Sequence, residues 1–364
     1  MRTSLYEEHV RLGARLVDYA GFQMPLDYGS SIAEHRSVRS AAGLFDVSHM
    51  GILPAEGPGA GDFLARVLTN DPRPLAAGRV LYSPMLDEDG SVIDDLLVYC
   101  LGPGRYRLVV NAGNRQADYE HLHAHATPSA GLAADFAPLA ILALQGPASE
   151  AILRLVLGGE IALPGSYRFT ETCDSAGNEL LVSRTGYTGE DGFELYLPAA
   201  AAPVLWQRLL ALGESHGLVA AGLAARDSLR LEAALPLYGH EISRERSVLD
   251  AGLGRFINFD REGFLGREAL LEWRASGRVR GRLALIATGR GLPRADDRVL
   301  DGEREIGYVT SGGYSPTLNC GIALVSTDPG ISYEEGRELV VQGARRALPA
   351  RVCQRPHYRR LRVR

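Results

Sequence analysis

The C-terminal part of the sequence, residues 278–364, constrains the fold of this chain more than any other segment. It consists of short β-rich runs that glycines interrupt, among them RGRLALIA, EIGYVTSG, CGIALV and RELVVQG. Short strands at close spacing with turn residues between them are typical of small antiparallel barrels. We therefore expect a small antiparallel β-barrel at the C-terminus, and residues 1–277 must form the rest of the molecule.

The rest of the sequence mixes helical and strand patterns, which indicates an α+β fold built from mixed α/β domains. A helical pattern near 7–17, a second near 33–41 and a strand from Phe45 open the chain, and helices and strands then alternate through 51–138. Within that stretch, VLYSPM and SVIDDLLVYC flank a DEDG turn and predict paired strands. The boundaries that we expect are a discontinuous domain of residues 1–50 plus 139–260, an inserted α/β domain of residues 51–138, a linker at 261–277 and the barrel domain at 278–364.

The composition excludes several classes of enzyme, because the chain contains no lysine and all 39 basic residues are arginines. Pyridoxal-phosphate enzymes, P-loop enzymes and protein kinases each need a lysine, so none of these classes fits. The formal net charge of −5 gives no support to a nucleic-acid partner. No apolar run approaches the ~20 residues of a membrane span, and the first residues lack the apolar core of a secretion signal. The four cysteines form no CxxC pair. We therefore expect a cytoplasmic protein with no membrane partner and no metal site.

Two adjacent carboxylates, Asp94 and Asp95, interrupt the apolar strand pattern VIDDLLVYC. Side chains alternate along a strand, so Asp95 shares a face with Tyr99 and Asp94 points to the other face. A carboxylate in apolar surroundings costs several kcal/mol unless it is paired or used. The pair therefore indicates either a functional carboxylate or a strand-end aspartate that bonds to a neighbouring loop.

The segment SRTGYTGEDGFE, residues 183–194, places three glycines among polar and aromatic residues. Such a turn suits the close approach of the backbone to a flat ligand. Glu194 follows on a short strand, with Tyr196 on its own face. A glutamate at a pocket edge can accept two parallel hydrogen bonds from an amidine-like edge such as that of a pterin. An ordinary hairpin loop is the alternative.

Arg226 and Arg230 lie one helical turn apart in the segment AARDSLRLEAALPL. Two arginines on one helix face can hold a carboxylate tail. The alternative is a pair within the helix, such as Asp227 with Arg230.

Taken together, these segments resemble the aminomethyltransferase (T-protein) family of the glycine cleavage system. The resemblance covers nearly the whole chain in order, through LYEEHVRLGARLVDYAGFQMPLDYGS, EHRSVRSAAGLFDVSHMG, LYSPMLDEDGSVIDDLLVY, RLVVNAGN, LALQGPAS, SRTGYTGEDGFEL, AARDSLRLEAALPLYGHE, GFLGREAL and TSGGYSPTLNCGIAL. So many colinear blocks make the resemblance very specific.

The resemblance implies a three-domain clover-leaf arrangement around a folate site, with residues 1–50 plus 139–260 as the folate-binding domain. It implies that a lipoylated H-protein delivers an aminomethyl group, that tetrahydrofolate accepts the methylene, and that ammonia leaves. The expected cosubstrate is tetrahydrofolate, with no metal, flavin or pyridoxal phosphate, and we expect a monomer. By motif, the catalytic carboxylate is Asp95. The positions that match the folate pocket are Tyr82, Tyr99, Asn111, Tyr187, Glu194 and Arg226.

The sequence departs from the family pattern at a few positions. Ala224 stands where glycine is common, His240 where glutamine is usual, and Phe22 where tryptophan is usual, and Ser247–Asp250 replaces a block with proline and glutamate. Relatives of this fold include folate-dependent demethylases and a non-enzymatic folate-binding accessory branch, and these are the alternative functions. The accessory branch carries a KxGCYxGQE block that is absent here.

The C-terminal residues 345–364 contain eight arginines and no acidic residue. This tail predicts either a solvated basic end or a segment near the mouth of the pocket that attracts anions, such as a folate tail or an acidic partner.

Overall fold

The computed structural model describes residues 1–133, 139–158, 161–174, 176–344 and 346–360. The chain divides into two compact units, which are described separately. The first unit comprises Met1–Gly61, Pro74–Leu81 and Leu97–Asp227, and the second comprises Asp62–Arg73, Tyr82–Leu96 and Ser228–Arg364.

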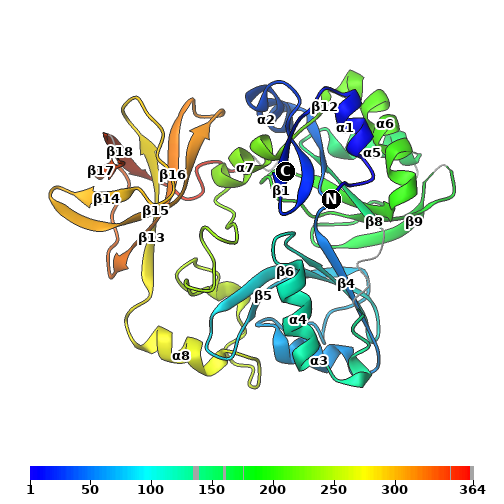
Figure 1. The fold of residues 1–364 in the computed structure, drawn as a ribbon, viewed down its shortest axis with the longest axis horizontal. Helices are drawn as coiled ribbons and strands as arrows, with labels where there is room; N and C mark the ends of the chain where they lie inside the picture. The colour runs from blue at the N-terminus through cyan, green and yellow to red at the C-terminus, as the bar shows by residue number, and fades with distance from the viewer. Residues whose placement is uncertain (134–138, 159–160, 175, 345, 361–364) are drawn as a thin grey trace. The chain divides into compact units, whose positions relative to one another are not determined.

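A six-stranded sheet is the centre of the first unit (Figure 1). Its order is β12-β3-β8-β11-β10-β9, and only the β12–β3 pair is parallel. The strand bounds are β3 (Ala42–Asp46), β8 (Leu139–Gln145), β9 (Phe169–Cys173), β10 (Glu179–Ser183), β11 (Gly192–Pro198) and β12 (Leu218–Ala220).

One face of this sheet packs against helices α5 (Ser149–Leu157) and α6 (Ala202–Gly213). Alternate strand residues such as Leu144 and Leu195 meet Trp206 of α6 in this core. The alternation leaves the intervening residues on the opposite face, where β11 carries Glu194 and Tyr196. The predicted faces of Glu194 and Tyr196 are therefore confirmed.

The start of the chain differs from the sequence prediction. The helix that the pattern places near 7–17 is α1 (Tyr6–Arg11), and β1 (Arg15–Tyr19) follows. Gly13 has φ +71°, and the amides of Gly13 and Ala14 bond back to carbonyls of the helix. This left-handed glycine ends the helix before the apolar pattern does. β1 pairs with β2 (Phe22–Asp27), and α2 (Ser31–Ser40) precedes β3.

A four-stranded sheet has the order β4-β7-β6-β5. Its strands are β4 (Gly51–Glu56), β5 (Arg79–Leu86), β6 (Val92–Gly102) and β7 (Arg105–Val110). The same stretch of the chain contains the helices α3 (Ala60–Val67) and α4 (Arg115–His125). β5 and β6 are joined by the predicted DEDG turn, where the amide of Gly90 donates to the carbonyl of Asp87 over 3.0 Å. Gly90 has φ +81°, a conformation that glycine adopts without strain.

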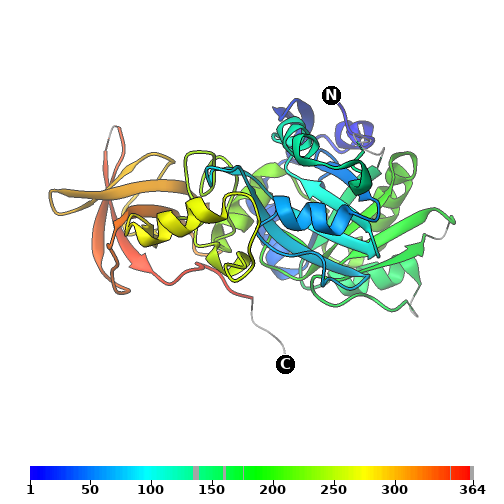
Figure 2. The ribbon, with the colours of Figure 1, turned by 90° about the horizontal axis from the view of Figure 1, so that it is seen from below.

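The C-terminal barrel is confirmed as a closed six-stranded barrel, drawn in orange to red in Figures 1 and 2. The strand order is β13-β16-β15-β14-β17-β18, with β13 (Arg280–Ala287), β14 (Arg298–Asp301), β15 (Arg304–Ser315), β16 (Cys320–Pro329), β17 (Glu338–Gln342) and β18 (Ala347–Cys353). Apolar residues from all six strands fill its interior.

The segment between the sheets and the barrel contains two further helices. They are α7 (Leu223–Glu232) and α8 (Arg267–Ala275), and α8 lies in the stretch expected to link the domains. Leu270 of α8 belongs to an apolar cluster with Val92 and Phe264. Short 3-10 helices span Pro128–Ala130, Ala199–Ala201, Glu214–His216 and Gly254–Phe256. Among the described residues, no helix has the length and apolarity to cross a membrane.

Candidate functional site

The second unit brings Tyr82 and Asp95 together across β5 and β6. The hydroxyl of Tyr82 donates to Oδ2 of Asp95 over 2.9 Å. The ring of Tyr82 is fixed edge-on against Phe256, with centroids 4.6 Å apart. This contact orients the carboxylate, because a packed aromatic ring leaves its hydroxyl little freedom to move.

The two adjacent aspartates occupy different environments. Asp94 is fully buried, whereas Asp95 is half-buried. Strand alternation predicts this difference, since the two side chains leave β6 on opposite faces. Asp95 is therefore the member of the pair that a ligand can reach.

In the first unit, the hydroxyl of Tyr99 lies at the centre of a buried polar network. It is 3.1 Å from Oγ of Ser183, 3.3 Å from Oγ1 of Thr185 and 2.8 Å from the hydroxyl of Tyr196. Burial raises the pKa of Tyr99, and the charge of Glu194 raises it further. Burial likewise raises the pKa of Tyr196 well above its usual value. Both phenols therefore remain protonated and serve as neutral donors.

Glu194 joins this network through one oxygen only. Its Oε2 accepts a 2.5 Å hydrogen bond from Thr185 and lies 3.5 Å from the hydroxyl of Tyr196. The side chain is 8% exposed. Within the described part of the chain, Oε1 accepts no hydrogen bond. The glutamate is thus held in place on one side and keeps acceptor capacity on the other.

A glutamine that the sequence interpretation missed positions the loop before Glu194. The side chain of Gln145 donates to the carbonyl of Thr185 over 3.1 Å and accepts from Thr188 over 3.0 Å. A Cβ on Gly186 would lie 2.0 Å from Gln145 Oε1, and one on Gly192 would lie 2.5 Å from its Nε2. These two glycines therefore make room for Gln145, whereas the sequence interpretation related the glycines of this loop to a flat ligand or to an ordinary hairpin.

An ion pair secures the tip of the same loop. Arg39 of α2 donates to the carbonyl of Thr188 over 2.8 Å and to Glu190 over 2.9 Å. Both side chains of the ion pair are almost fully buried. The loop is consequently fixed from two sides, which limits the movement of Tyr187 between them.

Arg226 stacks on Tyr187, with its guanidinium 4.9 Å from the ring centroid. Its Nη1 is buried without a hydrogen-bond partner among the described residues. Nearby, the pKa of His49 is lowered to about 4 by burial and by the charges of Arg226 and Arg115, against the opposing charge of Asp46. His49 is therefore neutral at pH 7 and adds no positive charge near Arg226.

Arg230 does not share the environment of Arg226. It is 2% exposed, and its guanidinium pairs with Glu241 over 3.0 Å and donates to Ser311 over 3.0 Å. Arg230 is engaged within the second unit, so Arg226 is the arginine of α7 with donor capacity left for a ligand.

The structure thus groups the sequence candidates as follows. Tyr82 contacts Asp95 in the second unit, and in the first unit Tyr99 and Glu194 share one network while Tyr187 and Arg226 form a stack. Asn111 follows the end of β7 in the first unit. Of the arginine tail, Arg345, Arg362 and Arg364 lie outside the described residues. No cluster of three or more potential metal ligands occurs among the residues described.

Comparison with known proteins gives matches along nearly the whole chain. Residues 5–261 match the family model of the GCVT N-terminal domain, and residues 280–359 match that of the glycine cleavage T-protein C-terminal barrel domain. The chain is 49% identical to an aminomethyltransferase of Moorella thermoacetica, covering 99% of this chain and 98% of the relative. It is 46% identical to an aminomethyltransferase of Symbiobacterium thermophilum, covering 98% and 97%.

A solved structure agrees with these matches. The glycine cleavage system aminomethyltransferase T from Bartonella henselae superposes with a TM-score of 0.87 at 35% identity, covering 98% of each chain. The agreement in sequence and fold extends over the sheets and the barrel alike. The chain therefore belongs to the glycine cleavage T-protein family of aminomethyltransferases and is an enzyme of the transferase class.

Proposed function

We propose that this enzyme transfers the methylene of an aminomethyl group from a lipoylated H-protein to tetrahydrofolate, with release of ammonia. The family supports this substrate pair, and the observation that carries the proposal is the Tyr82–Asp95 hydrogen bond. A fixed, half-buried carboxylate suits a reaction that passes through a cationic, iminium-like species.

The role of Asp95 follows from that geometry. A carboxylate held in place before the reaction stabilises developing positive charge without the cost of reorienting solvent. The hydroxyl of Tyr82 fixes Oδ2, which sets the direction from which the carboxylate faces the reacting nitrogen. Asp95 would thereby stabilise the cation and orient the folate nitrogen that attacks it.

The cluster in the first unit would bind the folate. Glu194 presents Oε1 to the amino group and adjacent ring N–H of the pterin, while Thr185 holds Oε2. Tyr196 offers the glutamate a neutral donor, and Tyr99 lies 2.8 Å from the hydroxyl of Tyr196 in the same network. Tyr187 offers an aromatic face, and the free Nη1 of Arg226 can donate to an acceptor of the substrate. We propose Asn111 as a further contact on the motif match alone.

The test is a coupled assay with tetrahydrofolate and two sets of donors. We expect formation of methylenetetrahydrofolate and ammonia with aminomethylated lipoyl H-protein, and no transfer from a panel of methoxy-aromatic or sulfonium compounds. Transfer from the panel in place of the H-protein adduct would contradict the proposal and identify a folate-dependent demethylase. The family matches already favour an enzyme over the folate-binding accessory branch. The monomeric state and the cytoplasmic location stay predictions.

A further inference from the structure

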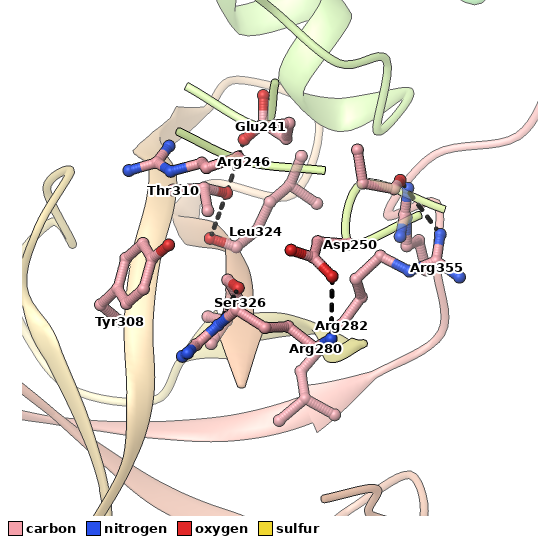
Figure 3. Close-up of a pocket in the computed structure, with 13 residues that line it drawn as sticks. Glu241, Arg246, Asp250, Arg280, Arg282, Tyr308, Thr310, Leu324, Ser326 and Arg355 are labelled. Atoms are coloured by element: carbon pink, nitrogen blue, oxygen red, sulfur yellow. Dashed lines mark hydrogen bonds between the residues drawn. The ribbon is translucent and has the colours of Figure 1, made fainter. Parts of the chain in front are cut away.

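A pocket in the second unit lies between the barrel and the chain segment that precedes it (Figure 3). It is lined by residues of β13, β15 and β16, by residues 241–251 and by Arg355. Four arginines and two carboxylates line it: Arg246, Arg280, Arg282, Arg355, Glu241 and Asp250. The arginines therefore exceed the carboxylates by two charges.

Both carboxylates of the pocket are already engaged. Glu241 accepts from Arg230 over 3.0 Å and from the hydroxyl of Thr310 over 2.6 Å. Asp250 accepts from the backbone amide of Arg280 over 2.9 Å and from the indole of Trp273 over 3.2 Å. Neither carboxylate thus forms an ion pair with an arginine side chain that lines the pocket.

Two of the arginines are held in place by an aromatic ring. The guanidinium groups of Arg246 and Arg280 lie 5.1 and 5.2 Å from the ring centroid of Tyr308. Arg280 also pairs with Asp328 over 3.1 Å. These contacts fix positive charge on one side of the pocket, across from Arg355 in Figure 3.

The other two arginines, Arg282 and Arg355, have no ion pair among the described residues. Arg282 donates to the carbonyl of Ala251 over 3.2 Å. Its guanidinium rests against Gly252, because a Cβ on that glycine would lie 1.2 Å from Nη1. Because Gly252 has no side chain, the guanidinium of Arg282 packs directly against its backbone. The N–H groups of Arg282 that do not bond to Ala251 stay available to a ligand.

The charges of these arginines repel one another. The pKa of Arg355 is lowered to about 10 by burial and by the positive charges of Arg282 and Arg255, which together outweigh the opposing charge of Glu241. Burial and Arg255 also lower the pKa of Arg282. Both groups stay protonated at pH 7, so the pocket keeps its positive charge. A bound anion would reduce the repulsion between the two arginines.

We propose that this pocket binds a phosphate group, free or as part of a small phosphate ester, through Arg282 and Arg355. A phosphate group carries a charge of about −1.5 to −2 at pH 7, which matches the excess of two positive charges. Guanidinium groups donate in a fork that fits phosphate oxygens, and two of them can engage three or four oxygens where a carboxylate offers two. The proposal is independent of the proposed function, because it uses none of the residues placed in the folate site.

Calorimetric titration of the full chain with inorganic phosphate tests the proposal. The buffer contains chloride, and ionic strength is kept constant. We expect saturable binding, and we expect Arg282→Gln and Arg355→Gln each to weaken it by about tenfold or more. Arg304→Gln is the matched control, since it removes an equal charge from an exposed position on the same barrel. It should leave the affinity unchanged.

Thermal melting checks that the variants fold. Without phosphate, each glutamine variant should melt at or slightly above the temperature of the parent, because a repelling charge is removed. Should Arg282→Gln fail to fold, Arg282→Lys keeps the charge and loses the fork, and it should still weaken binding. Absence of saturable binding, or equal weakening by Arg304→Gln, would overturn the site. Equal or tighter binding of succinate would overturn its assignment to phosphate, whereas phosphate esters that compete with inorganic phosphate would support it.

Discussion

Replacing Glu194 by glutamine separates the charge of this side chain from its shape. In the structure, Oε2 accepts from Thr185 over 2.5 Å and Oε1 has no partner among the described residues. A glutamine can keep its carbonyl oxygen toward Thr185, so the loop keeps its hydrogen bond. Its amide nitrogen then faces the ligand, where it meets the N–H donors of the pterin instead of accepting from them.

The magnitude follows from the loss of one charge-assisted hydrogen bond, worth about 1.5–3 kcal/mol. This corresponds to a loss of roughly 10- to 150-fold in affinity for tetrahydrofolate. Anaerobic calorimetry with the purified variant measures the dissociation constant, and thermal melting confirms that the fold is kept. Glu171→Gln is the matched control, because Glu171 is exposed on β9 of the same sheet. An unchanged affinity in a folded Glu194→Gln variant would remove Glu194 from the folate site.

The remaining predictions concern the carboxylate and one buried histidine. Asp95→Asn should reduce the rate of single-turnover transfer from H-protein by about 10²–10³-fold while folate affinity is kept. Asp94→Asn, on the opposite face of the strand, should leave that rate unchanged. Equal losses of rate in both variants would refute the catalytic role of Asp95. Tyr82→Phe should lower kcat by roughly tenfold with little change in folate affinity, because it removes the hydrogen bond that Tyr82 donates to Oδ2 of Asp95. The folded-state pKa of His49 is about 4 against 6.5 unfolded. Between pH 4 and pH 6.5 the unfolded chain therefore binds a proton at His49 that the folded chain does not bind. The free energy of unfolding should consequently fall as the pH drops through this window. Urea titrations at pH 7 and pH 5 should show a smaller drop for His49→Gln than for the parent chain.

The sequence predicted those features of the fold that depend on local periodicity. The strand pattern placed Asp94 and Asp95 on opposite faces and Glu194 with Tyr196 on one face, because side-chain direction in a strand follows from position alone. The closed barrel followed in the same way from short strands and their glycines. The end of α1 was missed, because a left-handed glycine at position 13 overrides the apolar pattern that continues beyond it.

Contacts between distant segments could not be predicted from spacing. Gln145 ends β8, and its packing against Gly186 and Gly192 depends on how a loop about 40 residues later returns to the sheet. The same holds for the ion pair of Arg39 with Glu190, which joins α2 to that loop. A buried glutamine that packs between glycines leaves no periodic pattern in the sequence. Only the folded chain therefore shows that these glycines provide space for the side chain of Gln145.

The two arginines of α7 show why a shared helix face does not imply a shared role. Residues four positions apart on a helix point in nearly the same direction, so the sequence allowed Arg226 and Arg230 to act together. Their partners differ: Glu241 and Ser311 take the donors of Arg230, whereas Arg226 rests on the ring of Tyr187 with Nη1 unpartnered among the described residues. A guanidinium that already pairs with a buried carboxylate gains little interaction energy from a ligand. If it moves toward the ligand, it leaves that carboxylate buried without its partner. We therefore propose that recognition of an anion or a carbonyl by this helix depends on Arg226, whereas Arg230 joins α7 to Glu241 and Ser311 within the second unit.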